Sequence, residues 1–194
     1  MPRPRGDHDA RRQDVARAVL CALGERGFAN LTMRAVAAEL GSSTGVLTHY
    51  FASKDELQVF ALKALLDTVD QRARAVAAPG MPTLRALLLG MLPLTGEAAV
   101  ANRIWISSRD VVLADAQLTA AYAATYAHSR DRLEGAIRSA QAAGELDDVE
   151  PAELAAGLHA VALGVSVQAV LEPAAFPPER QIALIDTYLQ HLAP

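Results

Sequence analysis

The stretch that most constrains this chain is residues 40–57, LGSSTGVLTHYFASKDEL. Gly41 follows an apolar run with helical spacing and can adopt the left-handed backbone that ends a helix. A helix barely two turns long is expected next, with an apolar side formed by Val46, Leu47, Tyr50 and Phe51. Ser53 and Glu56 then form a capping box that starts a new helix. A short, polar-faced helix held between two others is typical of a unit that reads the DNA major groove.

Two more helices are expected before this segment. Thr32 can cap a helix that runs to about Leu40. An earlier helix is expected from Asp9 or Asp14 to Arg26, ended by Gly27, with its apolar side at Val15, Ala18, Val19, Ala22 and Leu23. Three short helices around one small apolar core form a helix-turn-helix domain. Residues 1–8, which contain Pro and Arg, are expected to be a disordered arm that either stays in solvent or touches DNA phosphates.

The charge of the chain is unevenly distributed. The net charge is -4, but residues 1–54 hold eight Lys or Arg against five Asp or Glu. The positive excess therefore coincides with the predicted helix-turn-helix, where phosphates would bind. Aromatic residues make up 5% of a chain that is 52% apolar, which favours close-packed helices over sheets. The single cysteine, Cys21, excludes an internal disulfide, suits a reducing cytoplasm and is expected to be a small packing residue of the first helix.

Residues 11–57 resemble the DNA-binding domain of TetR-type transcriptional regulators. The resemblance is carried by Gly27-Phe28, residues 31–37, residues 41–47, His49-Tyr50-Phe51 and residues 53–57. Position 48, often a tyrosine in that family, is Thr48 here, which keeps a hydroxyl for a phosphate but lacks the aromatic contact. Residues 84–192 are similar to the BetI-like type of ligand-binding domain.

The residue types and the resemblance together indicate which side chains face DNA. Contacts to base edges or nearby phosphates are expected from Ser43, Thr44, Gly45 and Thr48. Contacts to phosphates are expected from His49 and Tyr50, and from the flanking helices through Thr32, Arg34 and Lys54.

The rest of the chain predicts a helical bundle. Helices are expected over residues 53–78, 81–93, 97–112, 115–143, 154–171 and 178–192. The expected fold is therefore all-α, with about nine helices in two domains. A helix-turn-helix domain would occupy residues 9–53, and a ligand-binding and dimerisation domain would occupy residues 54–194.

Residues 154–171 contain no charged side chain. The stretch is at the lower length limit for crossing a membrane and is rich in Ala and Gly, so a helix buried on most sides of a soluble protein fits better. TetR-type proteins dimerise through two C-terminal helices, which the resemblance implies here as well. The expected interface residues are Ala156, Ala160, Gly164, Gln168, Ile182, Ile185 and Leu189. The alternative is that both helices belong to the core of a monomer.

The resemblance also implies a small-molecule site within the bundle. The residues expected near it are Leu88, Met91, Leu92, Trp105, Tyr122, Tyr126 and His159. An aromatic wall of this kind would attract a quaternary amine. Ordinary core positions are the competing interpretation for Trp105 and His159.

Motifs typical of enzymes are missing from the sequence. The five histidines are too dispersed for a metal-binding motif, and the glycines do not form a phosphate-binding loop. No enzyme activity, cofactor or metal is therefore expected. The sequence predicts a cytoplasmic, homodimeric regulator, a repressor that binds a pseudo-palindromic operator in double-stranded DNA and is released by a small molecule. The alternatives are an activator on the same fold, or a helical ligand- or protein-binding module without operator binding.

Overall fold

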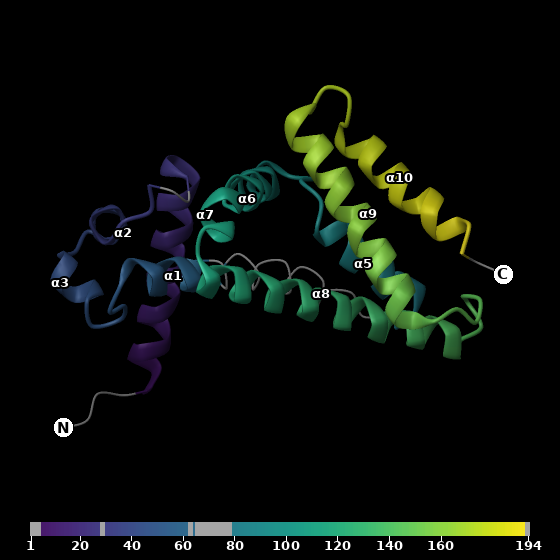
Figure 1. Ribbon diagram of the computed structural model, residues 1–194, viewed down its shortest axis with the longest axis horizontal. Helices are drawn as coiled ribbons and strands as arrows, with labels where there is room; N and C mark the ends of the chain where they lie inside the picture. Colours follow the sequence, from purple (N-terminus) through teal and green to yellow (C-terminus); the bar gives the residue numbers. More distant parts are fainter. Residues whose placement is uncertain (1–4, 28–29, 62–63, 65–78, 193–194) are drawn as a thin grey trace. The chain divides into compact units, whose positions relative to one another are not determined.

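The computed structural model describes residues 5–27, 30–61, 64 and 79–192. Every regular element among these residues is a helix, and they contain no strand (Figure 1). The all-α fold class is therefore confirmed. The chain divides into two compact units, one comprising residues 1–66 and 107–122 and the other residues 67–106 and 123–194. This division differs from the predicted boundary at residue 53, because residues 107–122 group with the N-terminal part.

Helix α1 (Arg5–Arg26) opens the first unit. It begins at Arg5, earlier than predicted and within the stretch expected to be a disordered arm. Its predicted apolar side is confirmed, with exposed fractions of 6% or less at Val15, Ala18, Val19, Ala22 and Leu23. Cys21, expected to pack inside, is exposed because its position lies off that side.

Two short helices follow, α2 (Met33–Glu39) and α3 (Thr44–Leu47). The capping box after them is confirmed: the Glu56 N–H donates to Ser53 Oγ at 3.1 Å, and the Glu56 carboxylate accepts from the Ala52 N–H at 2.7 Å. Residues 54–61 are helical, with Leu57 and Ala61 fully buried. The remainder of the helix predicted over residues 53–78 lies outside the described residues, apart from residue 64, which is also helical.

The helix predicted over residues 97–112 is interrupted. It forms α6 (Gly96–Ser107) and α7 (Arg109–Leu113), with a fully buried Ser108 between them. Serine side chains compete for backbone hydrogen bonds inside helices, which accounts for a break at this pair of serines. Helix α8 (Ala116–Ala142) follows. Asp115 precedes it and its carboxylate accepts from the Leu118 N–H at 2.9 Å, and the helix ends before Gly144, where φ is 72°.

The second unit is built on α5 (Met81–Gly90), α9 (Pro151–Leu171) and α10 (Pro178–Gln190), which pack against one another (Figure 1). Its apolar core includes Leu84, Leu88, Leu133, Ile137, Ala162 and Ile185. Polar contacts also fix α5: Glu145 accepts from the Met81 N–H at 2.9 Å, and Ser166 Oγ donates to the Met91 carbonyl at 2.9 Å. Helix α5 is thus held at both ends by other parts of the unit.

Helix α9 is apolar around most of its circumference. Among the described residues it is the one helix that is long and apolar enough to cross a membrane. This is weak evidence for a membrane span, because core helices of soluble proteins meet the same criteria. Only 39% of its most apolar window is buried within the chain. The expected burial on most sides is therefore not found within a single chain.

Candidate DNA-binding and ligand sites

The turn between α2 and α3 is fixed by backbone geometry. Thr32 caps α2, with Oγ1 accepting from the Ala35 N–H at 3.1 Å, and Gly41 ends it at φ 60°. The Ser42 N–H reaches the Ala37 carbonyl at 2.9 Å, and the Gly41 N–H reaches the Ala38 carbonyl at 3.1 Å. This is the double hydrogen bond of a Schellman helix end. It turns the chain sharply, as the glycine predicts.

One side of helix α3 is buried and the other side is exposed to solvent. Leu47 is fully buried and Phe51 is 5% exposed, with the Phe51 ring centroid 5.1 Å from that of Phe60. The opposite side is exposed and carries the predicted contact residues Ser43, Thr44, Gly45, Thr48 and His49. Tyr50 is half-buried. The structure therefore brings most of the predicted DNA-facing residues onto one surface, which we call the α3 face.

Several polar groups near the α3 face already have partners. Thr48 Oγ1 donates its hydrogen to the Gly45 carbonyl at 2.9 Å, so this hydroxyl remains only as an acceptor. Thr32 Oγ1 accepts from α2, which leaves its hydrogen for another acceptor. Thr32, Arg34 and Lys54 are exposed on the flanking segments. Ser42 does not join the α3 face, because its Oγ is buried without a hydrogen-bond partner.

Three of the residues predicted for a ligand site come together in the second unit. Trp105 of α6 and Tyr126 of α8 have ring centroids 5.9 Å apart, and Tyr126 meets His159 of α9 edge-on at 5.0 Å. We call these three residues the aromatic cluster. His159 is 4% exposed, and burial, aided by the charge of Arg130, lowers the pKa of its imidazole. The ring is therefore neutral at neutral pH.

The other four predicted ligand residues are buried or half-buried. Leu88 and Leu92 are 0% and 1% exposed in the core, and Met91 packs against that core. Tyr122 is 7% exposed and belongs to the first unit. Core and pocket positions share the same apolar helical spacing, so the place of these four residues at a ligand site stays a prediction.

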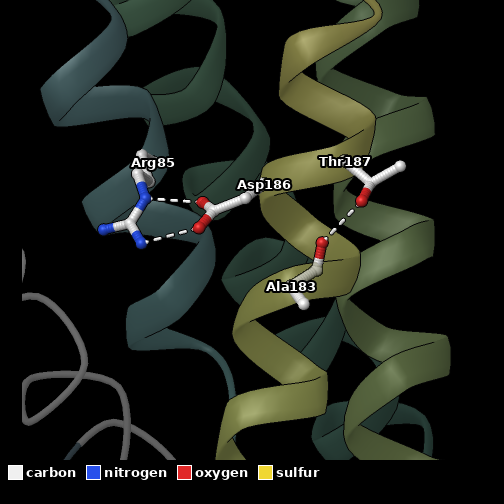
Figure 2. A network of polar contacts seen from close by, with 4 residues as sticks. All are labelled: Arg85, Ala183, Asp186 and Thr187. Atoms are coloured by element: carbon white, nitrogen blue, oxygen red, sulfur yellow. Dashed lines mark hydrogen bonds and ion pairs between the residues drawn. The ribbon is translucent and has the colours of Figure 1, made fainter.

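A separate cavity of about 1000 Å³ opens between α5, α10 and the segment that leads into α6. Leu92 is the one predicted ligand residue among its described lining residues. Arg85 crosses from α5 to Asp186 on α10, with Nε to Oδ1 at 2.6 Å and Nη2 to Oδ2 at 2.9 Å (Figure 2). This pairing raises the pKa of Arg85 and lowers the pKa of Asp186. No sequence pattern indicates this pair, whose members are 101 residues apart.

The predicted interface residues fall into two groups. Ala156, Ala160, Gly164 and Gln168 are all exposed on one side of α9, and Ile182 is half-buried. Ile185 and Leu189 are 1% and 5% exposed and pack in the core of their own chain, so neither lies on a free face. The large apolar residues exposed on these two helices are instead Leu171 of α9 at 70% and Tyr188 of α10 at 50%, which sequence reasoning did not select.

A helix-turn-helix corner with an exposed short helix, joined to a larger all-helical unit, defines a helix-turn-helix transcriptional regulator. Residues 14–59 match the family described as bacterial regulatory proteins, tetR family, and residues 81–194 match the family described as BetI-type transcriptional repressor, C-terminal. The chain belongs to the TetR family of transcriptional regulators, with a BetI-type C-terminal domain. This is a family of regulators rather than enzymes.

Individual relatives agree with this assignment. The chain is 35% identical to the regulator PksA of Bacillus subtilis over 104 residues, which are 52% of this chain and 51% of PksA, so it spans about half the length of that relative. It is 26% identical to the regulator BetI of Burkholderia thailandensis over 96% of this chain and 95% of BetI. A transcriptional regulator from Saccharomonospora viridis, crystallised in complex with choline, shares the fold with a TM-score of 0.82 and 20% identity, over 96% of this chain and 99% of that one.

Proposed function

We propose that this regulator is a ligand-responsive repressor that binds a pseudo-palindromic operator as a homodimer and leaves it when a small molecule binds. The observation that carries the proposal is the α3 face, where exposed Thr44, Thr48 and His49 are held by buried Leu47 and Phe51. A rigid exposed helix of this size fits the major groove of DNA.

The hydrogen bonds of the free protein refine the proposed DNA contacts. Thr44, with Ser43 and Gly45 beside it, offers a hydroxyl to a base or phosphate and a methyl to a thymine. Because Thr48 donates to Gly45, we assign its methyl group, rather than its hydroxyl hydrogen, to the DNA. Thr32 Oγ1 instead accepts a hydrogen bond, so its hydroxyl hydrogen can be donated to a phosphate oxygen. The remaining phosphate contacts are assigned to His49, Tyr50, Arg34 and Lys54.

The proposed dimer uses the exposed side of α9. Small residues at Ala156, Ala160 and Gly164 allow close approach of a second copy. Gln168 is exposed on the same side of α9, and half-buried Ile182 would contribute from α10. Leu171 and Tyr188, both largely exposed, add apolar area that a single chain leaves in water. A two-fold pair would present two α3 helices to two operator half-sites.

The proposed effector site is the aromatic cluster. A neutral imidazole beside Trp105 and Tyr126 does not repel a cation, and aromatic faces attract one. The choline complex of the Saccharomonospora viridis regulator supports a quaternary amine as the effector class. Since the Tyr126 ring contacts both Trp105 and His159, a ligand that enters between these rings would separate them and shift α6, α8 and α9. That displacement is the proposed origin of operator release.

The proposed domain division is residues 9–53 for DNA binding and residues 54–194 for ligand binding and dimerisation, and the family matches over residues 14–59 and 81–194 support it. We place the protein in the cytoplasm, where the operator is. An activator would bind DNA in the same way and differ only in the direction of the transcriptional response. A helical binding module without operator binding is the alternative that the experiment below excludes or supports.

The test is binding of the purified protein to the DNA upstream of its own gene and to a scrambled duplex, over a series of salt concentrations. The proposal expects selective binding, two subunits for each operator and a steep decrease with salt. The double variant Thr48→Ala with His49→Ala should lose selective binding. His128→Ala, which changes another exposed histidine, serves as the control and should bind as the wild type does. Equal, weak binding of all proteins to both duplexes would support the binding module instead.

A further inference from the structure

The cavity between α5 and α10 is separate from the aromatic cluster, because it shares none of the three cluster residues. Its volume of about 1000 Å³ is at the upper end of the range for small-molecule sites. Leu92 and Leu189, which are 1% and 5% exposed, form part of its wall, and Leu89 and Leu94 add further apolar surface. A wall of this composition can bury an alkyl chain.

The charged side chains at this cavity already have partners. Arg85 and Asp186 share two hydrogen bonds, from Nε to Oδ1 and from Nη2 to Oδ2, so each charge is compensated by the other (Figure 2). Glu97, the third charged residue of the described lining, also takes part in an interaction. A charged ligand would have to break these contacts or bury its own charge against leucines without a counterion, and both are costly. The cavity therefore favours a neutral ligand.

The pair of Arg85 and Asp186 can also bind the polar end of a neutral ligand. A guanidinium has five N–H donors, of which the pair uses two, and the Asp186 carboxylate keeps lone pairs that Arg85 does not occupy. A hydroxyl group both donates and accepts, so it matches both partners at once. The side chains of Arg85 and Asp186 are 45% and 33% exposed, so this polar end of the cavity is open to water, whereas the leucines are buried. This arrangement suits an amphiphile with a hydroxyl head and an alkyl chain.

We propose that this cavity binds a neutral alkyl alcohol, with its hydroxyl group at the pair of Arg85 and Asp186 and its chain along Leu89, Leu92 and Leu189. The proposed effector site at the aromatic cluster takes a cation, whereas this second site selects an uncharged molecule. The second site depends neither on DNA binding nor on the aromatic cluster, so either proposal can fail without the other.

The test is isothermal titration calorimetry of the full chain at neutral pH with probes of equal chain length: 1-octanol, octylamine and octanoate. 1-Octanol should bind with one molecule per chain, and each charged probe should bind at least about tenfold more weakly. 1-Hexanol should bind about fifteenfold more weakly than 1-octanol, because each buried CH₂ group strengthens binding about fourfold.

Two variants test the charge argument and the location. Asp186→Asn keeps the size of the side chain but leaves the charge of Arg85 without its partner, so it should bind octanoate at least about tenfold more tightly than the wild type does. Ala86→Phe fills the cavity and should weaken 1-octanol binding by more than about tenfold. Ala142→Phe makes the same replacement at an exposed position of α8 outside the described lining and should bind 1-octanol as the wild type does.

Trp105→Leu changes the aromatic cluster and should leave 1-octanol binding unchanged. Thermal melts confirm that each variant is folded, and Asp186→Asn, which alters a partly exposed ion pair, tests the proposal even if Ala86→Phe does not fold. The proposal is overturned if either charged probe or 1-hexanol binds the wild type as tightly as 1-octanol, or if Asp186→Asn gains no affinity for octanoate. It is also overturned if folded Ala86→Phe binds 1-octanol like the wild type, or if Trp105→Leu abolishes 1-octanol binding.

Discussion

Gly80 has a backbone conformation that only glycine adopts readily, and a side chain at this position would displace the end of the Glu145 side chain. Its φ is 84° and its ψ is -143°. A Cβ at this position would clash with Glu145 Oε2 and would lie 3.7 Å from the Ala140 Cα. The same Oε2 accepts the hydrogen bond from the Met81 N–H that fixes the start of α5. We therefore expect Gly80→Ala to strain the backbone and to displace Glu145 from α5.

The two effects have different magnitudes. The backbone strain of a residue with a side chain in this region is about 1–3 kcal/mol. Loss of the hydrogen bond from Met81 to the exposed Glu145 carboxylate adds about 1 kcal/mol. Gly80→Ala should therefore lower the free energy of unfolding by about 2–4 kcal/mol, a large part of the 5–15 kcal/mol typical of domains. Urea unfolding at one fixed protein concentration measures this difference, since dimer formation would make stability depend on concentration.

Gly144→Ala is the matched control. Gly144 also has a positive φ, 72°, but a Cβ there meets nothing within 4 Å, so only backbone strain of about 1–2 kcal/mol is expected. The contribution of the hydrogen bond is isolated by combining Gly80→Ala with Glu145→Ala. In that background Gly80→Ala should destabilise by about 1 kcal/mol less, because the displaced carboxylate is already gone. Equal losses for the two glycine variants, with no coupling to Glu145, would refute the reasoning.

Three further outcomes follow from the structure. Because burial, aided by Arg130, lowers the pKa of His159 from its ordinary value of 6.5, the unfolded chain binds more protons than the folded one in mild acid. The contribution of neutral His159 to stability should therefore be fully present above pH 6.5 and be lost as the pH falls below that value. In thermal melts, the stability of His159→Gln should decrease less than that of the wild type between about pH 7 and 5; an unchanged pH profile would contradict the assigned cause. Thr32→Val removes the cap of α2 and should lower the free energy of unfolding by about 1 kcal/mol in urea titrations, with Thr187→Val, an exposed position inside α10, as the comparison. Ala160→Glu places a charge on the exposed side of α9 and should yield monomers in analytical ultracentrifugation; a stable dimer would exclude that side as the interface.

The DNA-binding corner was predictable because its signals are local. Thr32 as a cap, Gly41 in the left-handed region and the box of Ser53 and Glu56 each act over a few residues, and the structure contains all three. The buried side of α1 followed in the same way from a strict apolar period. Helix caps, helix ends and the buried side of a helix can therefore be predicted from neighbouring residues in the sequence.

Contacts over long sequence separations were not predictable. Nothing near Gly80 indicates Glu145, and nothing near Arg85 indicates Asp186, because these pairs depend on how α5 packs against other elements. The same limit explains the error at Ile185 and Leu189. An apolar period identifies the side of α10 that is buried, but not whether the partner is its own chain or another, and here it is its own core.

Helix α9 presents the opposite case. Apolar residues lie all around it, so the sequence pattern does not indicate which side is buried. Its buried positions, which include Ala155, Leu158 and Ala162, alternate with equally apolar exposed positions at Ala156 and Ala160. A helix without a polar face leaves apolar area in water whichever side it turns to its own core. The chain keeps that area small by using Ala and Gly on the exposed side, and small residues there also let a second backbone approach closely. Leu171 lies at the end of the same side and is 70% exposed, so its large apolar side chain remains in water. The exposed side of α9 is therefore better explained as one half of an interface than as a solvated surface, and Ala160→Glu tests that explanation at its centre.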